Sequence, residues 1–218
     1  MKLIVFDVDG TLIDSQNMIC ASMVQAFDAA GQSAPEREAI LSIVGLSLPV
    51  AVARLAPALG AVEQDSIVAG YRAAFIAART AGHSPLYQGA LECLDALARR
   101  DDWLLSIATG KARRGLDAMI AAHGLQGRFI CTQTADEHPS KPHPSMLQRI
   151  LSQTGIDARD AVMIGDTSFD IEMAQAAGMA GFGVGWGYHP PQILTDAGAS
   201  LVAGDFPALT RALEEWAQ

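Results

Sequence analysis

From about residue 88 onward the chain alternates helical segments with short apolar strands, and this alternation restricts the folds open to it. Helical spacing predicts helices at about 89–99, 112–122, 144–154, 168–177 and 206–216. Apolar runs between them predict strands at about 103–108, 128–131, 161–164, 180–184 and 200–202. Strands that are apolar throughout and alternate with helices are typical of a parallel sheet covered on both faces. We therefore predict an α/β fold.

The N-terminus supplies one more strand, and a helical region separates it from the rest of the predicted sheet. Lys2–Phe6 is a largely apolar run that ends at Asp7. Helices are then expected at about 16–30, 36–43, 48–58 and 63–80, with no strand pattern among them. We therefore predict two domains, an α/β core formed by residues 1–14 and 83–218 and an inserted all-helical cap at 15–82.

Composition limits the class of protein. Half of the 218 residues are apolar and 18% are charged, which is typical of a folded chain with a full core. The net charge of −9 argues against a nucleic-acid-binding surface. There is no membrane-length apolar stretch and no signal-peptide pattern before the first strand, so we expect a cytoplasmic location. Cys20, Cys93 and Cys131 are expected to be reduced thiols, and nothing in the sequence indicates an oligomeric state.

Two carboxylates flank Val8 where the first strand ends. Asp7 and Asp9 would face the same side of an extended chain, and like charges this close destabilise a fold. A lone aspartate near glycine usually closes a turn or caps a helix. A pair needs a compensating charge, for which a divalent cation that prefers oxygen ligands is the natural candidate. Gly10 allows close backbone approach, and Thr11 can supply a hydroxyl.

Ligands of open parallel sheets bind beyond the carboxyl ends of the strands, so further chemistry is expected where later strands end. Thr109 and Gly110 can offer a hydroxyl and backbone N–H groups to an anion, or can form an ordinary capped turn. Lys111 and Arg113 either contact substrate or are solvated. Lys141 lies in a proline-rich loop that either holds its ammonium group in place or leaves it in solvent.

Two more aspartates follow the strand expected at 161–164. Asp166 lies at a strand end of a sheet that already carries an aspartate pair, so we predict that it binds metal. Asp170 lies in the first turn of the next helix. It either contributes to the same site or only stabilises the positive end of that helix, which Thr167 or Ser168 would cap.

Taken in order, these motifs resemble those of the haloacid dehalogenase-like (HAD) hydrolase superfamily. The motifs that carry the resemblance span nearly the whole chain: Asp7-Val8-Asp9-Gly10-Thr11, Thr109, Lys141 and Gly165-Asp166 with Asp170. Three stretches look like the phosphoglycolate phosphatase-like branch, which has a small helical cap: Asp9-Gly10-Thr11-Leu12-Ile13-Asp14-Ser15, Lys141-Pro142-His143-Pro144 and Ala176-Ala177-Gly178-Met179. Gln88 departs from that branch, which usually has proline at this position. Because the position lies at the start of the helix expected at about 89–99, the difference affects how the chain enters that helix. The resemblance implies a Rossmann-like core.

The resemblance also implies roles for the residues that match the motifs. Asp7 would be the nucleophile that forms an aspartyl-phosphate. Asp9 would protonate the leaving group and then accept a proton from water. Thr109 and Gly110 would bind the phosphoryl group, and Lys141 would neutralise charge on Asp7 and on the phosphate.

A magnesium ion is implied as cofactor. The expected ligands are Asp7, the backbone carbonyl of Asp9, and Asp166, with Asp170 binding directly or through water. Dehalogenases of the superfamily need no acid at position 9 and no metal, so the presence of Asp9 and Asp166 favours phosphoryl transfer. Phosphonate hydrolysis in this superfamily uses a cap lysine, and residues 16–81 contain none.

The expected activity is hydrolysis of a small phosphorylated metabolite such as phosphoglycolate. Pyrophosphate or a nucleoside monophosphate as substrate, a sugar-phosphate mutase, and an inactive binding protein stay open as alternatives. Substrate choice would depend on the cap. Its candidate contacts are Arg54, Arg72, Arg79 and the loop Val44–Ser47.

Overall fold

The computed structural model describes residues 1–218, apart from the side chain of Ala81, and contains a six-stranded parallel sheet. Its strands are β1 (Lys2–Phe6), β2 (Trp103–Thr109), β3 (Cys131–Thr134), β4 (Ala161–Gly165), β5 (Ala180–Val184) and β6 (Leu201–Ala203). They lie in the order β3-β2-β1-β4-β5-β6, so β1 is central and the strand order reverses beside it. The predicted α/β, Rossmann-like fold is confirmed.

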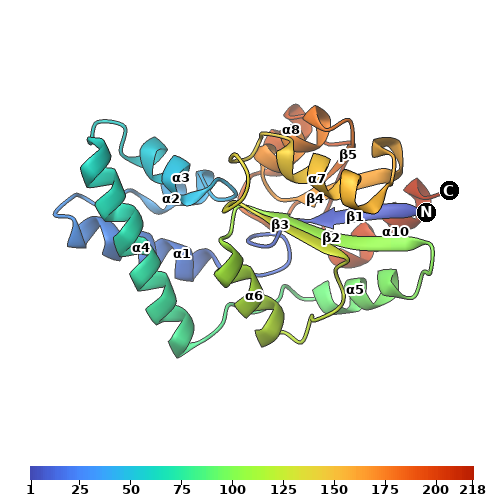
Figure 1. Cartoon of the computed structure of the whole chain (residues 1–218), viewed down its shortest axis with the longest axis horizontal. Coiled ribbons are helices and arrows are strands. Elements are labelled where there is room, and N and C mark those ends of the chain that lie inside the picture. The colour runs from blue at the N-terminus through green and yellow to red at the C-terminus, as the bar shows by residue number, and fades with distance from the viewer.

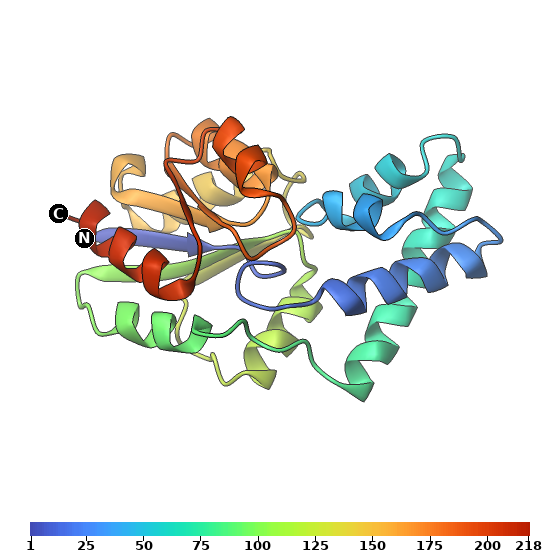
Figure 2. The ribbon, with the colours of Figure 1, turned by 180° about the vertical axis from the view of Figure 1, so that it is seen from behind.

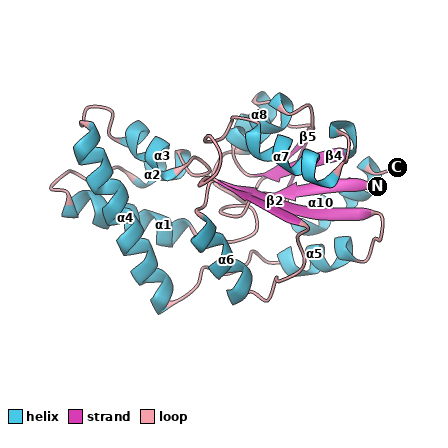
Figure 3. Ribbon diagram, viewed as in Figure 1, coloured by secondary structure: helices cyan, strands magenta, loops and turns pink.

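Helices cover both faces of this sheet (Figures 1 and 3). One layer contains α5 (Ala90–Ala98), α6 (Arg113–Ala122) and α10 (Phe206–Trp216), and the other contains α7 (Ser145–Thr154) and α8 (Ser168–Ala176). Ile4 and Phe6 of β1 are buried with the first layer, whereas Leu3 and Val5 are buried with the second. Alternate residues of a strand face opposite sides, so a central strand covered on both sides is apolar at all its buried positions, here Leu3–Phe6.

Residues 15–82 form a separate helical segment beside the carboxyl edge of the sheet (Figure 2). It consists of α1 (Gln16–Ala29), α2 (Arg37–Ser42), α3 (Leu48–Leu55) and α4 (Ala61–Ala81). It has its own buried cluster, which includes Ile19, Phe27, Ile40 and Ile67. The segment therefore has a buried apolar cluster of its own, while a smaller cluster joins Ile43, Leu46 and Ala51 to Phe169 of α8.

Two adjacent stretches of chain join the helical segment to the sheet. Ile13 pairs antiparallel with Leu86. The backbone N–H of Asp14 donates to the carbonyl of Pro85 at 2.9 Å, and that of Tyr87 donates to Leu12 at 3.0 Å. Entry and exit are thus hydrogen-bonded to each other, which fits an insertion in the loop after β1.

Two details of the predicted core were wrong. The strand expected at about 128–131 is β3 at Cys131–Thr134, an edge strand that tolerates polar residues, while the apolar residue Ile130 just before it is exposed. A short helix that was not predicted, α9 (Pro191–Asp196), starts at a proline and buries Leu194. No helix among the described residues is long and apolar enough to cross a membrane. The cytoplasmic location stays a prediction.

Candidate active site

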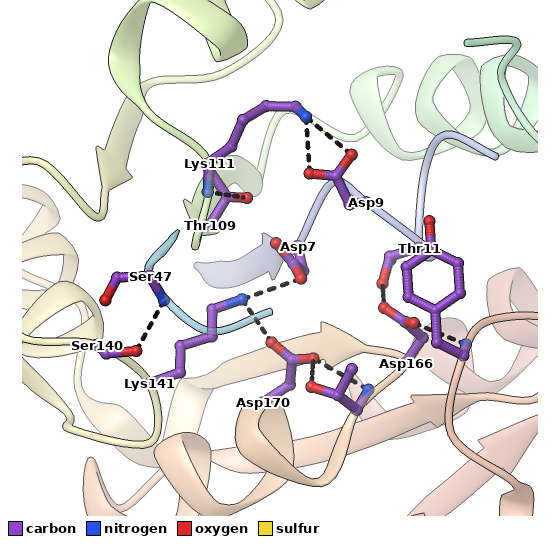
Figure 4. Close-up of polar contacts among 12 residues, drawn as sticks. Asp7, Asp9, Thr11, Ser47, Thr109, Lys111, Ser140, Lys141, Asp166 and Asp170 are labelled. Carbon is purple, nitrogen blue, oxygen red and sulfur yellow. Dashed lines mark hydrogen bonds and ion pairs between the residues drawn. The ribbon is translucent and has the colours of Figure 1, made fainter. Parts of the chain in front are cut away.

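The polar residues singled out in the sequence converge at the carboxyl ends of three neighbouring strands (Figure 4). Asp7 follows β1, Thr109 ends β2, and Asp166 follows β4. Lys141 reaches them from the loop between β3 and α7, and Asp170 does so from the first turn of α8. Parallel strands bring their carboxyl ends to one edge, which explains why residues so far apart in the chain meet.

Three carboxylates and one ammonium group form the buried centre. One oxygen from each of Asp7, Asp166 and Asp170 lies within 4.8 Å of the others, and all three side chains are buried. Lys141 Nζ lies 3.0 Å from Oδ2 of Asp7 and 2.6 Å from Oδ1 of Asp170. One lysine leaves net negative charge when all three carboxylates are ionised, and burial makes that charge costly.

Hydrogen bonds fix Asp166 and Asp170 in place. Thr11 Oγ1 donates to Oδ1 of Asp166 at 2.8 Å, and the backbone N–H of Tyr188 donates to Oδ2 at 2.9 Å. Oδ2 of Asp170 accepts the hydroxyl and the backbone N–H of Thr167, forming a capping box at the start of α8. Asp170 therefore caps its helix and also contributes to the carboxylate cluster, so the two interpretations of this residue are compatible.

Burial and mutual repulsion perturb the titration of the cluster. Burial, opposed by Lys141 and reinforced by Asp170 and Asp9, raises the pKa of Asp7 to about 6. Burial and the charges of Asp170 and Asp7 raise the pKa of Asp166 well above its usual range. Burial alone would lower the pKa of Lys141, but Asp170 and Asp7 outweigh it and the pKa is raised. The lysine is therefore held as a cation, whereas the carboxylates need more positive charge than it supplies.

The cluster fits a divalent cation that prefers oxygen ligands. Neither carboxylate oxygen of Asp7 accepts a hydrogen bond within the described part of the chain, although Oδ2 is ion-paired with Lys141. Buried oxygens without hydrogen-bond donors are rare in folded proteins and indicate a missing partner. The three candidate ligand atoms, one each from Asp7, Asp166 and Asp170, are carboxylate oxygens, which suit Mg²⁺.

Asp9 belongs to a second charged group on the helical side of the cluster. Lys111 Nζ lies 2.8 Å from Oδ1 and 2.7 Å from Oδ2 of Asp9. Ser15 Oγ donates to Oδ1 at 2.6 Å and lies 2.9 Å from the hydroxyl of Tyr188. The Lys111 ammonium group also lies 5.1 Å from the ring centroid of Phe75 in α4. Asp9 is therefore held by side chains from the sheet domain and from the entry to α1.

A cavity of about 550 Å³ lies between the sheet edge and the helical segment. The sheet domain contributes Asp7, Asp9, Thr109, Gly110, Lys111, Ala112, Arg114, Gly115, Ala135 and Asp136 to its lining. The helical segment contributes Ile19, Met23, residues 43–49, Ala51, Tyr71, Arg72, Phe75, Ile76 and Arg79. A ligand in this cavity would contact both Asp7 and the helical segment.

The loop Val44–Ser47 closes one side of this cavity. Gly110 lies so close to Gly45 that a Cβ atom at position 110 would overlap the backbone carbonyl of Gly45. The backbone N–H of Ser47 donates to Ser140 Oγ at 2.8 Å, next to Lys141. Glycine is required at position 110 because the two backbones approach so closely.

The other basic residues singled out in the sequence divide into those that reach the cavity and those that do not. Arg72 and Arg79 line the cavity. Arg54 does not, because its guanidinium group lies 5.2 Å from the ring centroid of Phe169. Lys111 contacts Asp9, whereas Arg113 donates two hydrogen bonds to Thr132. Of the two cations singled out in the sequence after Thr109, the structure thus brings Lys111, and not Arg113, to the site.

The loop after β5 was missed in the sequence. Tyr188 contacts Asp166 and Ser15, while His189 Nδ1 accepts the backbone N–H of Ser168 at 3.1 Å. The Nε2 atom of His189 lies 3.1 Å from the carbonyl of Ser42, at the end of α2. Ligands of open parallel sheets bind beyond the carboxyl ends of the strands. Because this loop follows the carboxyl end of β5, its position in the sequence also indicated a place in the site.

Comparisons with known proteins agree with the fold and show the family of the chain. The family model for haloacid dehalogenase-like hydrolases matches residues 4–184. The chain is 33% identical to "Probable phosphatase IndB" of Dickeya dadantii, over 92% of this chain and 91% of that protein. It is 34% identical to the pyrophosphatase PpaX of Bacillus pumilus, over 85% and 84% of the two chains.

Two further similarities cover almost the whole chain. A phosphoglycolate phosphatase of Vibrio parahaemolyticus is 28% identical, over 96% of this chain and 94% of that protein. Among solved structures, a hydrolase from Pseudomonas syringae has the same fold, with a TM-score of 0.89 over 100% of both chains at 24% identity. The similarity therefore includes the helical segment as well as the sheet.

Proposed function

Because the chain belongs to the haloacid dehalogenase-like hydrolase family and is a hydrolase of the phosphatase type, we propose that it is a Mg²⁺-dependent phosphatase acting through an aspartyl-phosphate on Asp7. One observation carries this proposal. Asp7 is buried at the end of the central strand, its oxygens accept no hydrogen bond from the described residues, and it borders the cavity. A carboxylate placed in this way is available to metal and to substrate.

In the first step, an oxygen of Asp7 attacks the phosphorus atom of a phosphomonoester. The bond from phosphorus to the leaving oxygen breaks, and the protonated carboxyl of Asp9 donates its proton to that oxygen. Ser15 and Lys111 hold the carboxyl of Asp9 at the cavity wall. Asp7, the backbone carbonyl of Asp9 and Asp166 would hold Mg²⁺, with Asp170 directly or through water, and the ion would supply positive charge against the phosphoryl group.

In the second step, water attacks the phosphorus of the aspartyl-phosphate. The carboxylate of Asp9 accepts a proton from this water, and the bond from phosphorus to the Asp7 oxygen breaks, which releases inorganic phosphate and restores both carboxyl groups. Thr109 and the backbone at Gly110 bind the phosphoryl oxygens from the cavity wall. Lys141, already paired with Asp7, stabilises the charge that develops as the bond forms.

The helical segment, residues 15–82, acts in this proposal as a cap that excludes water from the site. Its loop Val44–Ser47 lies over Gly110, and α4 forms the opposite wall of the cavity. The substrate is a small phosphorylated metabolite. The relatives are named phosphoglycolate phosphatase and pyrophosphatase, so phosphoglycolate and pyrophosphate are the first compounds to test.

The proposal is tested with Asp7→Asn and a matched control. The variant should lose at least about a thousandfold in kcat on p-nitrophenyl phosphate with Mg²⁺ while remaining folded by circular dichroism. The control, Asp14→Asn, changes a carboxylate that does not line the cavity and should retain activity. Near-normal turnover by Asp7→Asn would refute the assignment. Phosphate release, assayed beside isomer formation from glucose 1-phosphate, separates a phosphatase from a mutase.

A further inference from the structure

One face of α4 forms the wall of the cavity opposite the sheet. Arg72, Phe75, Ile76 and Arg79 follow one another at spacings of three, one and three residues, which places them on the same side of a helix. The two arginines therefore flank a central apolar pair. Phe75 lies over Lys111, so this face is directed at the phosphatase site described above.

A third arginine meets this face from the sheet domain. Arg114, in the first turn of α6, also lines the cavity, and Nη1 of Arg79 donates to its backbone carbonyl at 3.4 Å. This contact brings the end of α4 and the start of α6 together. It brings one arginine of the helical segment next to one arginine of α6 at the wall of the cavity.

These three arginines have no acidic partner within the described part of the chain. Arg100, Arg113, Arg128 and Arg159 each lie within 4.0 Å of an aspartate, although the exposed pairs among them contribute little to stability. Arg72, Arg79 and Arg114 form no such pair, and neither do five other arginines of the described chain, but only these three of the unpaired arginines line the cavity. Asp136 also lines the cavity, but its carboxylate accepts the backbone N–H of Arg113 and pairs with none of the three arginines. Arg72 and Arg114 are exposed and Arg79 is half-buried, so the cavity wall carries unpaired guanidinium groups that an anion can reach.

The other lining residues of the cavity and its volume indicate what kind of ligand would fit between Asp7 and the arginines. Apolar side chains from α1, α4 and the loop between α2 and α3 line it, among them Ile19, Met23, Val44, Leu46 and Ile76. Its volume of about 550 Å³ lies in the range of about 300–1,000 Å³ typical of sites for drug-sized ligands. A two-carbon acid such as glycolate would leave most of this apolar wall without contact.

We infer that the substrate is a phosphomonoester whose leaving group has an apolar spacer longer than glycolate and carries a second anionic group, which Arg72, Arg79 and Arg114 bind at the wall formed by α4 and the start of α6. The inference rests on the proposed phosphatase function and specifies its substrate class. The arginines act as specificity-determining residues. The phosphoryl group is still the one transferred to Asp7.

The test is a series of ω-phosphooxy carboxylic acids of increasing length that starts with phosphoglycolate, each paired with its neutral carboxamide. Phosphate release gives kcat/KM for every compound. The ratio of acid to amide should rise with chain length to about tenfold or more, because a guanidinium–carboxylate contact contributes over about 1.4 kcal/mol. In Arg72→Gln/Arg79→Gln the ratio should fall towards one at the long lengths.

Arg54→Gln is the control, because Arg54 belongs to the helical segment but lies on Phe169 outside the cavity. It should keep the ratio of the unmodified protein. A ratio near one at every length, a maximum at phosphoglycolate, or a ratio unchanged in the double variant would overturn the inference while phosphatase activity stands. No phosphate release from any compound, p-nitrophenyl phosphate included, would overturn the proposed function and the inference with it.

Discussion

Lys111 and Asp9 form an ion pair at the cavity wall, with Nζ 2.7 Å from Oδ2, and their side chains are only 9% and 12% exposed. The same ammonium group lies over Phe75, which belongs to the helical segment. The residue proposed to move protons is thus linked, through one lysine, to the helix that carries the cavity arginines. A change in the position of α4 would therefore alter the contact of Lys111 with Phe75 and, through it, the ion pair with Asp9.

Removing Lys111 should destabilise the fold, because it leaves the carboxylate of Asp9 largely buried with Ser15 as its remaining donor. We expect Lys111→Met to lower the free energy of unfolding by about 2–3 kcal/mol, since breaking a buried pair leaves an uncompensated charge. Urea denaturation of Lys111→Met, Asp9→Asn and the double variant gives the coupling energy. Strictly additive effects would mean that the pair does not interact.

Gly110→Ala should impair catalysis more than it impairs folding. Its Cβ would overlap the Gly45 carbonyl, so the loop Val44–Ser47 must move away from the site. We expect kcat/KM to fall by at least about tenfold, with a change in Tm of a few degrees. Gly204→Ala is the control, since a Cβ there meets no atom within 4 Å. Equal activity of the two variants would show that the close approach is unimportant.

Removal of metal should make stability fall with rising pH. In the metal-free protein the pKa of Asp7 is raised from 3.8 to about 6, so the folded state binds more protons than the unfolded state between these values. This contribution to stability is present at low pH and is lost as pH rises through about 6. The loss at pH 7 is on the order of 3 kcal/mol for Asp7.

Urea denaturation in EDTA, from pH 4.5 to 7.5, measures this effect. Asp7→Asn removes the titrating carboxyl, so its stability should decline less than that of the unmodified protein across the range. Added Mg²⁺ should raise the Tm of the unmodified protein at pH 7 and raise that of Asp166→Asn much less. Parallel pH profiles for the unmodified protein and Asp7→Asn would contradict the effect assigned to this carboxyl.

The sheet could be predicted because buried parallel strands leave a strong signal. Residues such as Leu3, Ile4, Val5 and Phe6 are apolar without alternation, since both faces of β1 are covered. The position of the candidate site could be predicted once the strands were located, because Asp7, Thr109 and Asp166 each lie where a strand ends. The edge strand β3 was misplaced because its polar residues carry no such signal.

The partners of these residues could not be predicted, because they depend on how separate elements pack. Nothing near Lys111 in the chain indicates that it would pair with Asp9 rather than remain in solvent. Likewise Arg54 and Arg72 are both helical arginines, and only the packing of α4 against the sheet domain separates them. Long-range side-chain contacts have no periodic pattern in the sequence.

The central claim, that Asp7 carries the phosphoryl group, is tested by trapping the intermediate in Asp9→Asn. This variant should hydrolyse the aspartyl-phosphate about a hundredfold or more slowly, because no carboxylate accepts the proton of the attacking water. The variant is mixed with p-nitrophenyl phosphate and Mg²⁺, quenched in acid, and treated with borohydride, which reduces an acyl phosphate to an alcohol. Peptide mass spectrometry should then find homoserine at position 7. Reduction at another residue, or continued turnover with position 7 unmodified, would contradict the account.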